Sequence, residues 1–493
     1  MNELDEALYR VDAVRRIEAQ AMALPGHDAG SLMQRAGAAA LAFLRTRWPL
    51  ARRIAVVCGS GNNGGDGYVL ATLARAVGID VDVVQVGAMP TRAPAVQAVE
   101  RWRDAGGVFR GDDVQATLSA ADVVVDALLG IGLDRAPEGA QCAAIEAINA
   151  CGRPVFALDL PSGLDGDTGH APGACVRATA TLSFIVWKRG LWTGAAAEVC
   201  GERHLAALDV PATSLAGIAP DARLLARSDL SQALKPRPRD AHKGQAGYVL
   251  VVGGDLGLGG AVLIAGTAAA RAGAGLVGVA TRPEHVAAVL ARQPELMARG
   301  IVAANDLDAL VERADVIAFG PGLGQSDWSL ALALRACASG KPLVLDADAL
   351  NWLAAHRIAP TGDCVLTPHP GEAARLLGTT VAAIAVDRFA AARRLAAQYG
   401  AAVVLKGAGS LVVDADGEVA VCPFGNPGMA SGGMGDALTG IVAALWAQGL
   451  PAIAAARIGV LAHALAGDRA ARAGERGLLA TDLVAELRAV LNP

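Results

Sequence analysis

The sequence lacks the features that mark several common classes of protein. Its 493 residues contain no long run of Lys and Arg, and the formal net charge is -5, so a nucleic-acid partner is not expected. None of its eight cysteines forms a C-x-x-C pair, and its histidines do not cluster at the spacing of zinc ligands. We therefore expect reduced thiols in a cytoplasmic protein.

Signals for export or for a membrane span are also missing. Residues 1–10 are acidic and lack the apolar core of a signal peptide. The uncharged run Ala437–Ala456 is long enough to raise the question of a membrane helix. Gly440, Gly449 and Pro451 divide it, however, so we expect a buried helix followed by a turn, and no membrane partner.

The sequence has instead the material for large cores and an alternation of strands and helices. Hydrophobic residues make up 53% of the chain, which is too much for a disordered protein. Alternating strands and helices favour parallel sheets with crossover helices. The expected strands are Arg53–Cys58, Val81–Val86, Ala121–Ala127, Val155–Leu160 and Ala180–Val186, and then Tyr248–Val252, Leu276–Ala280, Val316–Phe319, Leu343–Asp346 and Ala402–Leu405.

A boundary between two domains is expected near residue 225. The periodicity fades between Pro211 and Lys243, and the segment 235–240 (KPRPRD) has the prolines of an extended connection. The prediction is thus one α/β domain over residues 1–225 and a second over residues 226–493.

The first predicted strand leads into the glycine-rich segment 59–67 (GSGNNGGDG), and a helix is expected at Tyr68–Val77. Glycines allow close backbone approach, and amides at a helix start point at an anion. The segment matches neither G-x-G-x-x-G nor G-x-x-x-x-G-K-[ST]. It fits a phosphate cradle or a purely structural turn, although Asn62 and Asn63 can also contact ribose, phosphate or a cation.

Two further predicted strands of the first domain end in carboxylates. Asp126 precedes 128–134 (LLGIGLD), and Asp159 precedes 160–163 (LPSG). Ligands of open α/β sheets gather at the carboxyl ends of the strands, where these groups and the glycine-rich segment should converge. Either carboxylate alone could instead cap the turn that follows it.

The second domain contains three glycine-rich segments, at 253–261, 320–324 and 426–440. The last places Asp436 near the start of an apolar helix, where it could take a proton from an attacking hydroxyl or merely cap the helix. His369 lies between two prolines, so it is either structural or presented to a ligand. The turn 406–410 follows a strand and could hold a nucleotide phosphate.

The three motifs of the first domain, in this order, resemble the NAD(P)HX epimerase family, also called the YjeF N-terminal domain, over roughly residues 10–215. The resemblance implies a Rossmann-like three-layer fold, with Asp159 as the catalytic acid/base. It implies a potassium ion bound by Asn63, Asp126 and Ser162. It implies substrate contacts at Asn62, Asn63, Gly64, Gly65, Asp66, Gly130, Ile131, Gly132, Leu133, Asp134, Arg135, Ala136 and Asp159.

The segment 426–440 (NPGMASGGMGDALTG), with the other glycine-rich segments, resembles the ADP/ATP-dependent NAD(P)HX dehydratase family, a branch of the ribokinase-like fold, over roughly residues 230–490. The resemblance implies Asp436 as the catalytic base, and Mg²⁺ with the nucleotide. It implies substrate contacts at Ala261, Gly322, His369 and Asp436. It implies nucleotide contacts at Lys406, Gly407, Ala408, Gly409, Ser410 and Gly435.

Together the two resemblances imply repair of the hydrated cofactors NADHX and NADPHX: the first domain interconverts the R and S epimers, and the second dehydrates the S epimer with ADP or ATP. They also imply a homo-oligomer. Two other functions remain open from the residues. One is a small-molecule kinase with a regulatory N-terminal domain, and the other is a binding module whose N-terminal domain senses a nucleotide or serves as a scaffold.

Overall fold

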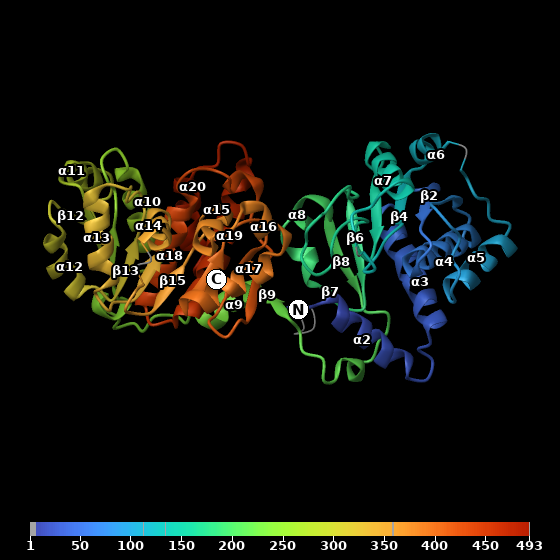
Figure 1. Ribbon diagram of the computed structural model, residues 1–493, viewed down its shortest axis with the longest axis horizontal. Coiled ribbons are helices and arrows are strands. Elements are labelled where there is room, and N and C mark those ends of the chain that lie inside the picture. The colour runs from blue at the N-terminus through green and yellow to red at the C-terminus, as the bar shows by residue number, and fades with distance from the viewer. Residues whose placement is uncertain (1–5, 112, 134, 357–358, 493) are drawn as a thin grey trace. The chain divides into compact units, whose positions relative to one another are not determined.

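The computed structural model describes residues 6–111, 113–133, 135–356 and 359–492. The chain divides into two compact units, Met1–Arg223 (unit 1) and Leu224–Pro493 (unit 2). Each unit contains its own mainly parallel sheet, in agreement with the expected α/β class (Figure 1).

The main sheet of unit 1 has six parallel strands in the order β3-β2-β4-β5-β6-β8. Their bounds are β2 (Arg53–Cys58), β3 (Asp80–Gln85), β4 (Val123–Ala127), β5 (Val155–Leu158), β6 (Ala180–Phe184) and β8 (Glu202–Ala206). The first five confirm the expected strands to within about two residues at each end. β8 was not expected, because its sequence ERHLA carries charge and is only partly buried.

Helices cover both faces of this sheet, because alternate residues of each buried strand point to opposite sides. Ile54 and Val56 of β2 belong to one core, and Ala55 and Val57 belong to the other. The first core is covered by α2 (Val11–Met22), α3 (Ala29–Arg47), α4 (Asn62–Ala76) and α5 (Ala95–Asp104), and the second by α6 (Val114–Ala120) and α7 (Ala140–Ala150). Unit 1 is therefore the three-layer domain that was expected.

Helix α4 starts at Asn62, six residues before the expected Tyr68. From Asn62 onward the glycine-rich segment is helical, and its glycines lie where no side chain fits. A Cβ on Gly64 would lie 2.1 Å from the Gly59 carbonyl oxygen, and one on Gly67 would lie 2.6 Å from the Ala127 Cβ. The glycines thus bring the helix start against the ends of β2 and β4.

Three short strands outside the six-stranded sheet include a residue that matters for the site of unit 1. β1 (Ala7–Tyr9) pairs in parallel with β7 (Trp187–Lys188) and antiparallel with β9 (Ala222–Leu224). Short helices α8 (Ala196–Val199), η1 (Arg189–Trp192) and η2 (Ala212–Leu215) complete the unit.

The sheet of unit 2 has the order β12-β11-β10-β13-β14-β15-β16-β17-β18. Its strands are β10 (Tyr248–Val252), β11 (Leu276–Thr281), β12 (Met297–Gly300), β13 (Val316–Phe319), β14 (Leu343–Leu345), β15 (Cys364–Leu366), β16 (Ala402–Leu405), β17 (Ser410–Val413) and β18 (Val419–Cys422). The strands from β12 to β16 are parallel, and β16, β17 and β18 form an antiparallel meander. The five expected strands are confirmed, and β12, β15, β17 and β18 were not expected.

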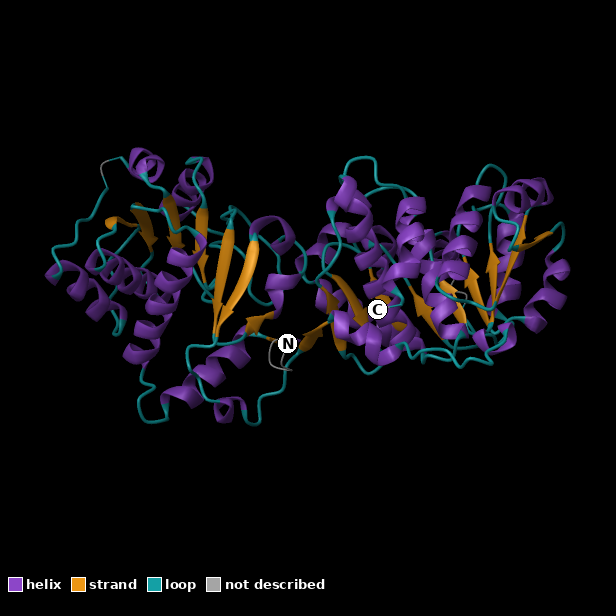
Figure 2. Ribbon diagram, turned by 180° about the vertical axis from the view of Figure 1, so that it is seen from behind, coloured by secondary structure: helices purple, strands orange, loops and turns teal. Residues whose placement is uncertain are grey.

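One face of this sheet packs on α10 (Gly259–Arg271), α18 (Met434–Ala447), α19 (Ala452–Ala470) and α20 (Ala480–Val490). The remaining helices are α9 (Arg227–Ala233), η3 (Lys243–Ala246), α11 (Pro283–Arg292), η4 (Ala304–Leu307), α12 (Asp308–Arg313), α13 (Asp327–Cys337), α14 (Asp348–His356), α15 (Pro370–Leu377), α16 (Val381–Val386), α17 (Arg388–Tyr399), η5 (Pro427–Met429) and η6 (Ala471–Ala473). Figure 2 shows the strands lying between these helices.

The uncharged run 437–456 forms most of α18, a turn, and the start of α19, as expected. Residues 437–445 are buried in the core of unit 2. Among the residues that the structure describes, no helix is both long and apolar enough to cross a bilayer.

We predict that Gly440→Ala selectively destabilises unit 2. A Cβ on Gly440 of α18 would lie 2.1 Å from the carbonyl oxygen of Ala265 in α10, so the two helix backbones must separate. Overpacking of this kind costs about 1–3 kcal/mol. Calorimetry should show a lower Tm for the unit 2 transition and an unchanged unit 1 transition.

The matched control is Gly260→Ala in α10, where a Cβ would meet no atom within 4 Å. It should leave the Tm of unit 2 unchanged or raise it slightly, because Ala is the better helix former. Equal stability of the two variants would contradict the close helix packing described above.

Candidate active sites

The first candidate site lies at the carboxyl ends of the unit 1 strands, where Asp126 links two loops. Its carboxylate accepts hydrogen bonds from the Ser162 amide (2.8 Å), the Ser162 hydroxyl (2.6 Å) and the Leu128 amide (3.2 Å). Burial raises the pKa of Asp126 to about 6, against the opposing effect of the Ser162 hydrogen bonds. The expected convergence of the strand-end motifs is therefore present.

Asn63 adds an unsatisfied oxygen to this cluster. Its Nδ2 donates to the Leu129 carbonyl (2.9 Å), and the Ser162 hydroxyl lies 3.2 Å from the same carbonyl oxygen. Its Oδ1 is buried and has no hydrogen-bond partner among the described residues. A buried acceptor without a donor is costly, so this oxygen, near those of Asp126, Ser162 and Leu129, suits a bound cation.

Asp159 is held by one carboxylate oxygen and presents the other. Its Oδ1 forms a short ion pair with Lys188 Nζ and accepts from the Phe184 amide (3.3 Å). A Cβ on Gly130 would lie 3.5 Å from Asp159 Oδ2 and 3.3 Å from the Asn63 Cβ. Oδ2 therefore faces the same small space as Asn63, which glycine at position 130 leaves open.

The backbone of Asp159 has φ 65°, in the left-handed region that is uncommon for residues other than glycine. Lys188 is 1% exposed, and its ammonium also donates to the Phe184 carbonyl (2.8 Å) and the Ser183 hydroxyl (3.2 Å). Three acceptors thus satisfy the three ammonium protons, which fixes the position of the Asp159 carboxylate.

Two more carboxylates lie in the electrostatic field of this pair. Burial raises the pKa of Asp66 well above its usual value, and the nearby Asp159 raises it further. Burial also raises the pKa of Glu18 on α2, although Lys188 opposes the effect. Asp66 belongs to the glycine-rich segment and was expected, whereas Glu18 lies outside the recognised motifs and was not.

The other expected contact residues of unit 1 are distributed around this space. Gly64 and Gly65 are buried in the first turn of α4, while Asn62 is exposed. The Ile131 carbonyl accepts from Arg15 Nη2 (3.3 Å), which ties the loop to α2. Gly132 and Arg135 are exposed, and Leu133 and Ala136 are half-buried. Asp134 lies outside the described residues.

The second candidate site lies in unit 2 around Asp346, which directly follows β14. Its carboxylate pairs with Lys406 Nζ (2.6 Å) and accepts from the Thr439 hydroxyl (2.9 Å). Burial acts to raise the pKa of Asp346, but Lys406 and the hydroxyl hydrogen bonds outweigh it and lower the pKa. Asp346 is therefore ionised, and each of its two carboxylate oxygens has a partner.

Asp436, in the first turn of α18, lies beside Asp346. The N-cap of the helix is Gly433, so Asp436 does not act as its N-cap. Burial and then the charge of Asp346 raise the pKa of Asp436 to about 6, while Lys406 opposes the shift. A Cβ on Gly435 would lie 3.2 Å from both Asp346 Oδ2 and Lys406 Nζ, so these groups form one cluster.

His369 and Glu372 approach the cluster from the start of α15. His369 is the N-cap of this helix, and its Nδ1 accepts from the Gly371 amide (3.0 Å). Its Nε2 lies 3.4 Å from Glu372 Oε1, and Glu372 Oε2 lies 3.8 Å from Lys406 Nζ. Burial and the charge of Lys406 lower the pKa of His369. The imidazole thus has a structural role and is also exposed next to the cluster.

The remaining expected contacts of unit 2 fall into two places. A Cβ on Gly322 would lie 2.9 Å from the Ala261 Cβ, so the loop after β13 touches the first turn of α10. The turn 406–410 joins β16 to β17, and Lys406 turns its ammonium toward Asp346. Buried Arg388 lies beneath this turn and donates to the carbonyls of Leu405 and Lys406 (3.2 Å each).

The partners that orient the expected residues were not predicted; among them are Lys188, Asp346, Glu372 and Thr439. Lys188 is 29 residues from Asp159, and Lys406 is 60 residues from Asp346. No local sequence pattern indicates pairs of residues that lie so far apart in the chain. The one available signal was that Asp346, like Asp126 and Asp159, ends a predicted strand.

Two family models match the chain, one in each unit. The model described as YjeF-related protein N-terminus matches residues 29–190, and the model described as NAD(P)H-hydrate dehydratase matches residues 249–489. The first range contains Asn63, Asp126 and Asp159, and the second contains Asp346 and Asp436.

Relatives match across both units. The bifunctional NAD(P)H-hydrate repair enzyme of Coxiella burnetii is 46% identical over 99% of this chain and 99% of its own length. That of Escherichia coli is 44% identical over 99% of this chain and 95% of its own. A solved ribokinase-like superfamily protein from Enterococcus faecalis is 31% identical with a TM-score of 0.52, over 55% of this chain and 96% of its own. The chain belongs to the family of bifunctional NAD(P)H-hydrate repair enzymes.

Proposed function

We propose that this chain repairs hydrated nicotinamide cofactors in two steps. Unit 1 interconverts the R and S epimers of NADHX and NADPHX. Unit 2 dehydrates the S epimer to NADH or NADPH at the expense of ADP or ATP, with release of phosphate. One observation carries the proposal: a single chain matches both family models and aligns over its whole length with repair enzymes.

In the first step, Asp159 acts as the acid/base. The substrate has a hydroxyl on ring carbon 6, next to nitrogen, and its configuration can change by loss and return of water or by ring opening. Either route requires proton transfer at that oxygen, for which a positioned carboxyl typically provides about 10²–10⁴-fold acceleration. Asp159 Oδ2 faces the open space at Gly130, whereas Oδ1 is held by Lys188.

Potassium fits the oxygen cluster next to Asp159. Asn63 Oδ1, Asp126 and Ser162 would bind it, together with the Leu129 carbonyl. When bound, the ion would supply positive charge that helps to orient the substrate. The support for this site is the buried Asn63 oxygen, which has no partner among the described residues.

In the second step, Asp436 takes the proton from the ring hydroxyl as that oxygen attacks the terminal phosphoryl group. Loss of phosphate and of a ring proton then restores the dihydronicotinamide. Phosphate is a far better leaving group than hydroxide, which explains why a kinase fold would catalyse a dehydration. The amides at the start of α18 would stabilise the transferring group.

The nucleotide would lie along the turn 406–410 and Gly435, with the substrate at Ala261, Gly322, His369 and Asp436. Mg²⁺ would be carried mainly by the nucleotide phosphates, as is usual for this ion. We further propose a cytoplasmic homo-oligomer that uses ADP as donor.

We predict that Asp159→Asn abolishes epimerisation and leaves dehydration of pure S-NADHX unchanged. The amide keeps the shape of the side chain but cannot accept and return a proton. The measurement is the rate of R to S conversion by chromatography. Asp209→Asn is the matched control, because Asp209 also has a left-handed backbone (φ 54°) but is exposed. Full epimerase activity of Asp159→Asn would contradict the assignment and favour a scaffold role.

We predict that Asp436→Asn lowers kcat of dehydration by at least about 10²-fold. In the unmodified chain, kcat should fall as the pH drops below about 6, because a raised pKa means that Asp436 is protonated there and cannot act as a base. Asp346, Asp348 and Lys406 are the charged groups that set this value. The pH profile of kcat is the measurement.

Asp482→Asn is the control for this variant, since Asp482 also lies in the first turn of a unit 2 helix but is exposed. It should have the normal pH profile. A stable phosphorylated product in place of released phosphate would instead identify unit 2 as a small-molecule kinase.

We predict that epimerisation is stimulated by K⁺ and that Asn63→Ala raises the K⁺ concentration needed for half-maximal rate. The substitution removes the unpartnered buried oxygen. Rates would be measured in KCl against N-methyl-D-glucamine chloride at equal ionic strength, which separates ion binding from general salt effects. Identical rates in the two salts would exclude a functional potassium site.

A further inference from the structure

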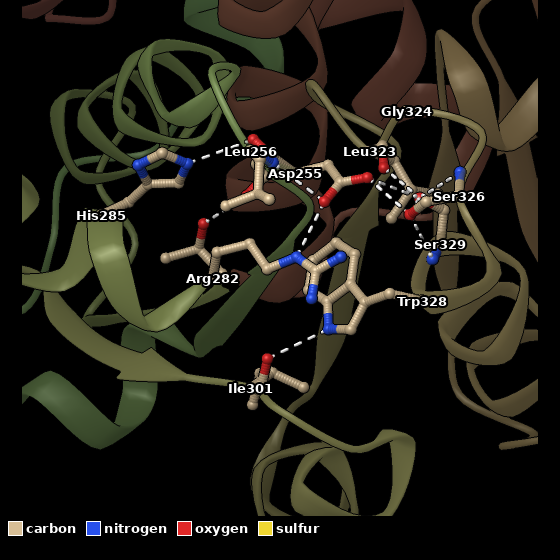
Figure 3. Close-up of polar contacts among 12 residues, drawn as sticks. Asp255, Leu256, Arg282, His285, Ile301, Leu323, Gly324, Ser326, Trp328 and Ser329 are labelled. Carbon is tan, nitrogen blue, oxygen red and sulfur yellow. Dashed lines mark hydrogen bonds and ion pairs between the residues drawn. The ribbon is translucent and has the colours of Figure 1, made fainter.

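A polar network in unit 2, outside the residues discussed above, centres on Asp255 and is shown in Figure 3. Asp255 follows β10, and its carboxylate accepts from Arg282 Nε (2.8 Å), the Ser326 hydroxyl (2.6 Å) and the Leu256 amide (2.9 Å). These donors come from the loops after β10, β11 and β13. The carboxylate therefore joins three loops at one edge of the sheet.

Asp255 is a charged anchor in this network. Burial acts to raise the pKa of Asp255, but the hydrogen bonds from Ser326 and Arg282 outweigh it, so the pKa lies below its usual value. The nearby Ser329 hydroxyl lies 3.4 Å from the same carboxylate.

Arg282 is held rigidly, yet its hydrogen-bonding capacity is mostly unused. Its guanidinium stacks on Trp328, 4.2 Å from the ring centroid, and the indole N–H is fixed by the Ile301 carbonyl (3.0 Å). Within the described parts of the chain, only Asp255 accepts a hydrogen bond from this guanidinium, and it does so through Nε. The N–H groups of both terminal nitrogens are thus available to a ligand, and the side chain is 21% exposed.

The network adjoins the expected substrate loops. The Asp255 amide donates to the Gly322 carbonyl (2.7 Å), and Gly322 touches Ala261. Neighbouring strands lie about 4.8 Å apart, and β11 is three strands from β14 in the order β11-β10-β13-β14. The carboxyl end of β11, which carries Arg282, is therefore about 14 Å along the sheet edge from that of β14, which carries Asp346.

In a dinucleotide only one ribose separates the nicotinamide from the pyrophosphate, so the long side chain of Arg282 must cover part of this separation. With the nicotinamide ring at Asp436, beside Asp346, the rest of the molecule must extend over neighbouring strand ends. The extension over β13 and β10 leads past Gly322 and Ala261 to Arg282. In the sheet order, β10 lies between β11 and β13, so this is the point where the order reverses and where open α/β sheets bind ligands.

We propose that Arg282 binds the pyrophosphate of the dinucleotide substrate in unit 2, an inference that rests on the proposed function. The planar guanidinium offers two terminal nitrogens, which match two phosphate oxygens. Asp255 and Trp328 fix its orientation in advance, so little side-chain entropy is lost on binding. Arg282 is then a determinant of affinity for the substrate, and not a catalytic residue.

The test is Arg282→Gln in the full chain, with steady-state dehydration of three substrates: S-NADHX, S-NADPHX, and the hydrated reduced mononucleotide, which lacks the pyrophosphate bridge. KM for both dinucleotides should rise about 10- to 100-fold, the usual effect of losing a charge-assisted hydrogen bond. We expect kcat, the KM for the mononucleotide and the KM for ADP to stay within about twofold. Epimerisation in unit 1 should be unchanged.

Arg313→Gln is the matched control, because Arg313 also stacks on an aromatic ring, that of Tyr248. Tyr248 is the first residue of β10, so this pair lies at the amino ends of the strands, away from the carboxyl ends. This variant should have no effect on KM. Arg282→Lys should rescue the dinucleotide KM only in part, since an ammonium cannot make the paired contact.

Several results would overturn the proposal. An equal rise in KM for all three substrates, or a lower kcat at constant KM, would mean that Arg282 only shapes the loops. An effect on NADPHX alone would assign it to the 2′-phosphate, and an effect on the KM for ADP would assign it to the co-substrate. Failure of the unmodified chain to dehydrate any substrate would instead contradict the proposed function.

Discussion

The structure of both candidate sites depends on a buried ion pair between a carboxylate at a strand end and a lysine distant in the sequence. In unit 1 the pair is Asp159 with Lys188, and in unit 2 it is Asp346 with Lys406. Removing one partner of such a pair typically costs about 3–5 kcal/mol, because the other charge is left buried and uncompensated. Each pair therefore fixes where the loops of its site can lie.

The two pairs differ in how the reactive group is related to the anchor. In unit 1, Asp159 is both the anchor and the reactive group: one oxygen is bound by Lys188 and the other faces the open space at Gly130. In unit 2 the roles are divided: Asp346 is saturated by Lys406 and Thr439, and its charge helps to raise the pKa of the neighbouring Asp436. A carboxylate whose oxygens all have partners thus raises, through its charge, the pKa of a neighbouring carboxylate that has none. This arrangement keeps the pKa of the base close to neutral pH.

Much of the fold, and the strand-end positions of Asp126 and Asp159, could be predicted from the sequence because buried parallel strands are continuous apolar runs and loops follow them directly. The roles of the other expected site residues came only from the family resemblance and stay predictions. VVVDA and VFALD are examples in which strand and strand-end carboxylate are read together. The helical start of α4 could not be predicted, because glycines usually indicate a loop. The close packing against Gly59 and Ala127, which leaves no room for a side chain, is not visible in the local sequence. Lys188 lies on a two-residue strand that pairs with β1, an arrangement without a local pattern.

The central claim is that one chain carries two complementary sites, so that both epimers of a damaged cofactor are recovered. The most direct measurement is the return of absorbance at the wavelength of reduced nicotinamide, when the full chain acts on a mixture of R- and S-NADHX with K⁺, Mg²⁺ and ADP or ATP. If both sites are active, the whole mixture recovers, faster than by spontaneous epimerisation. Recovery that stops at the S fraction would contradict the epimerase assignment, and no recovery with either nucleotide would contradict the dehydratase assignment.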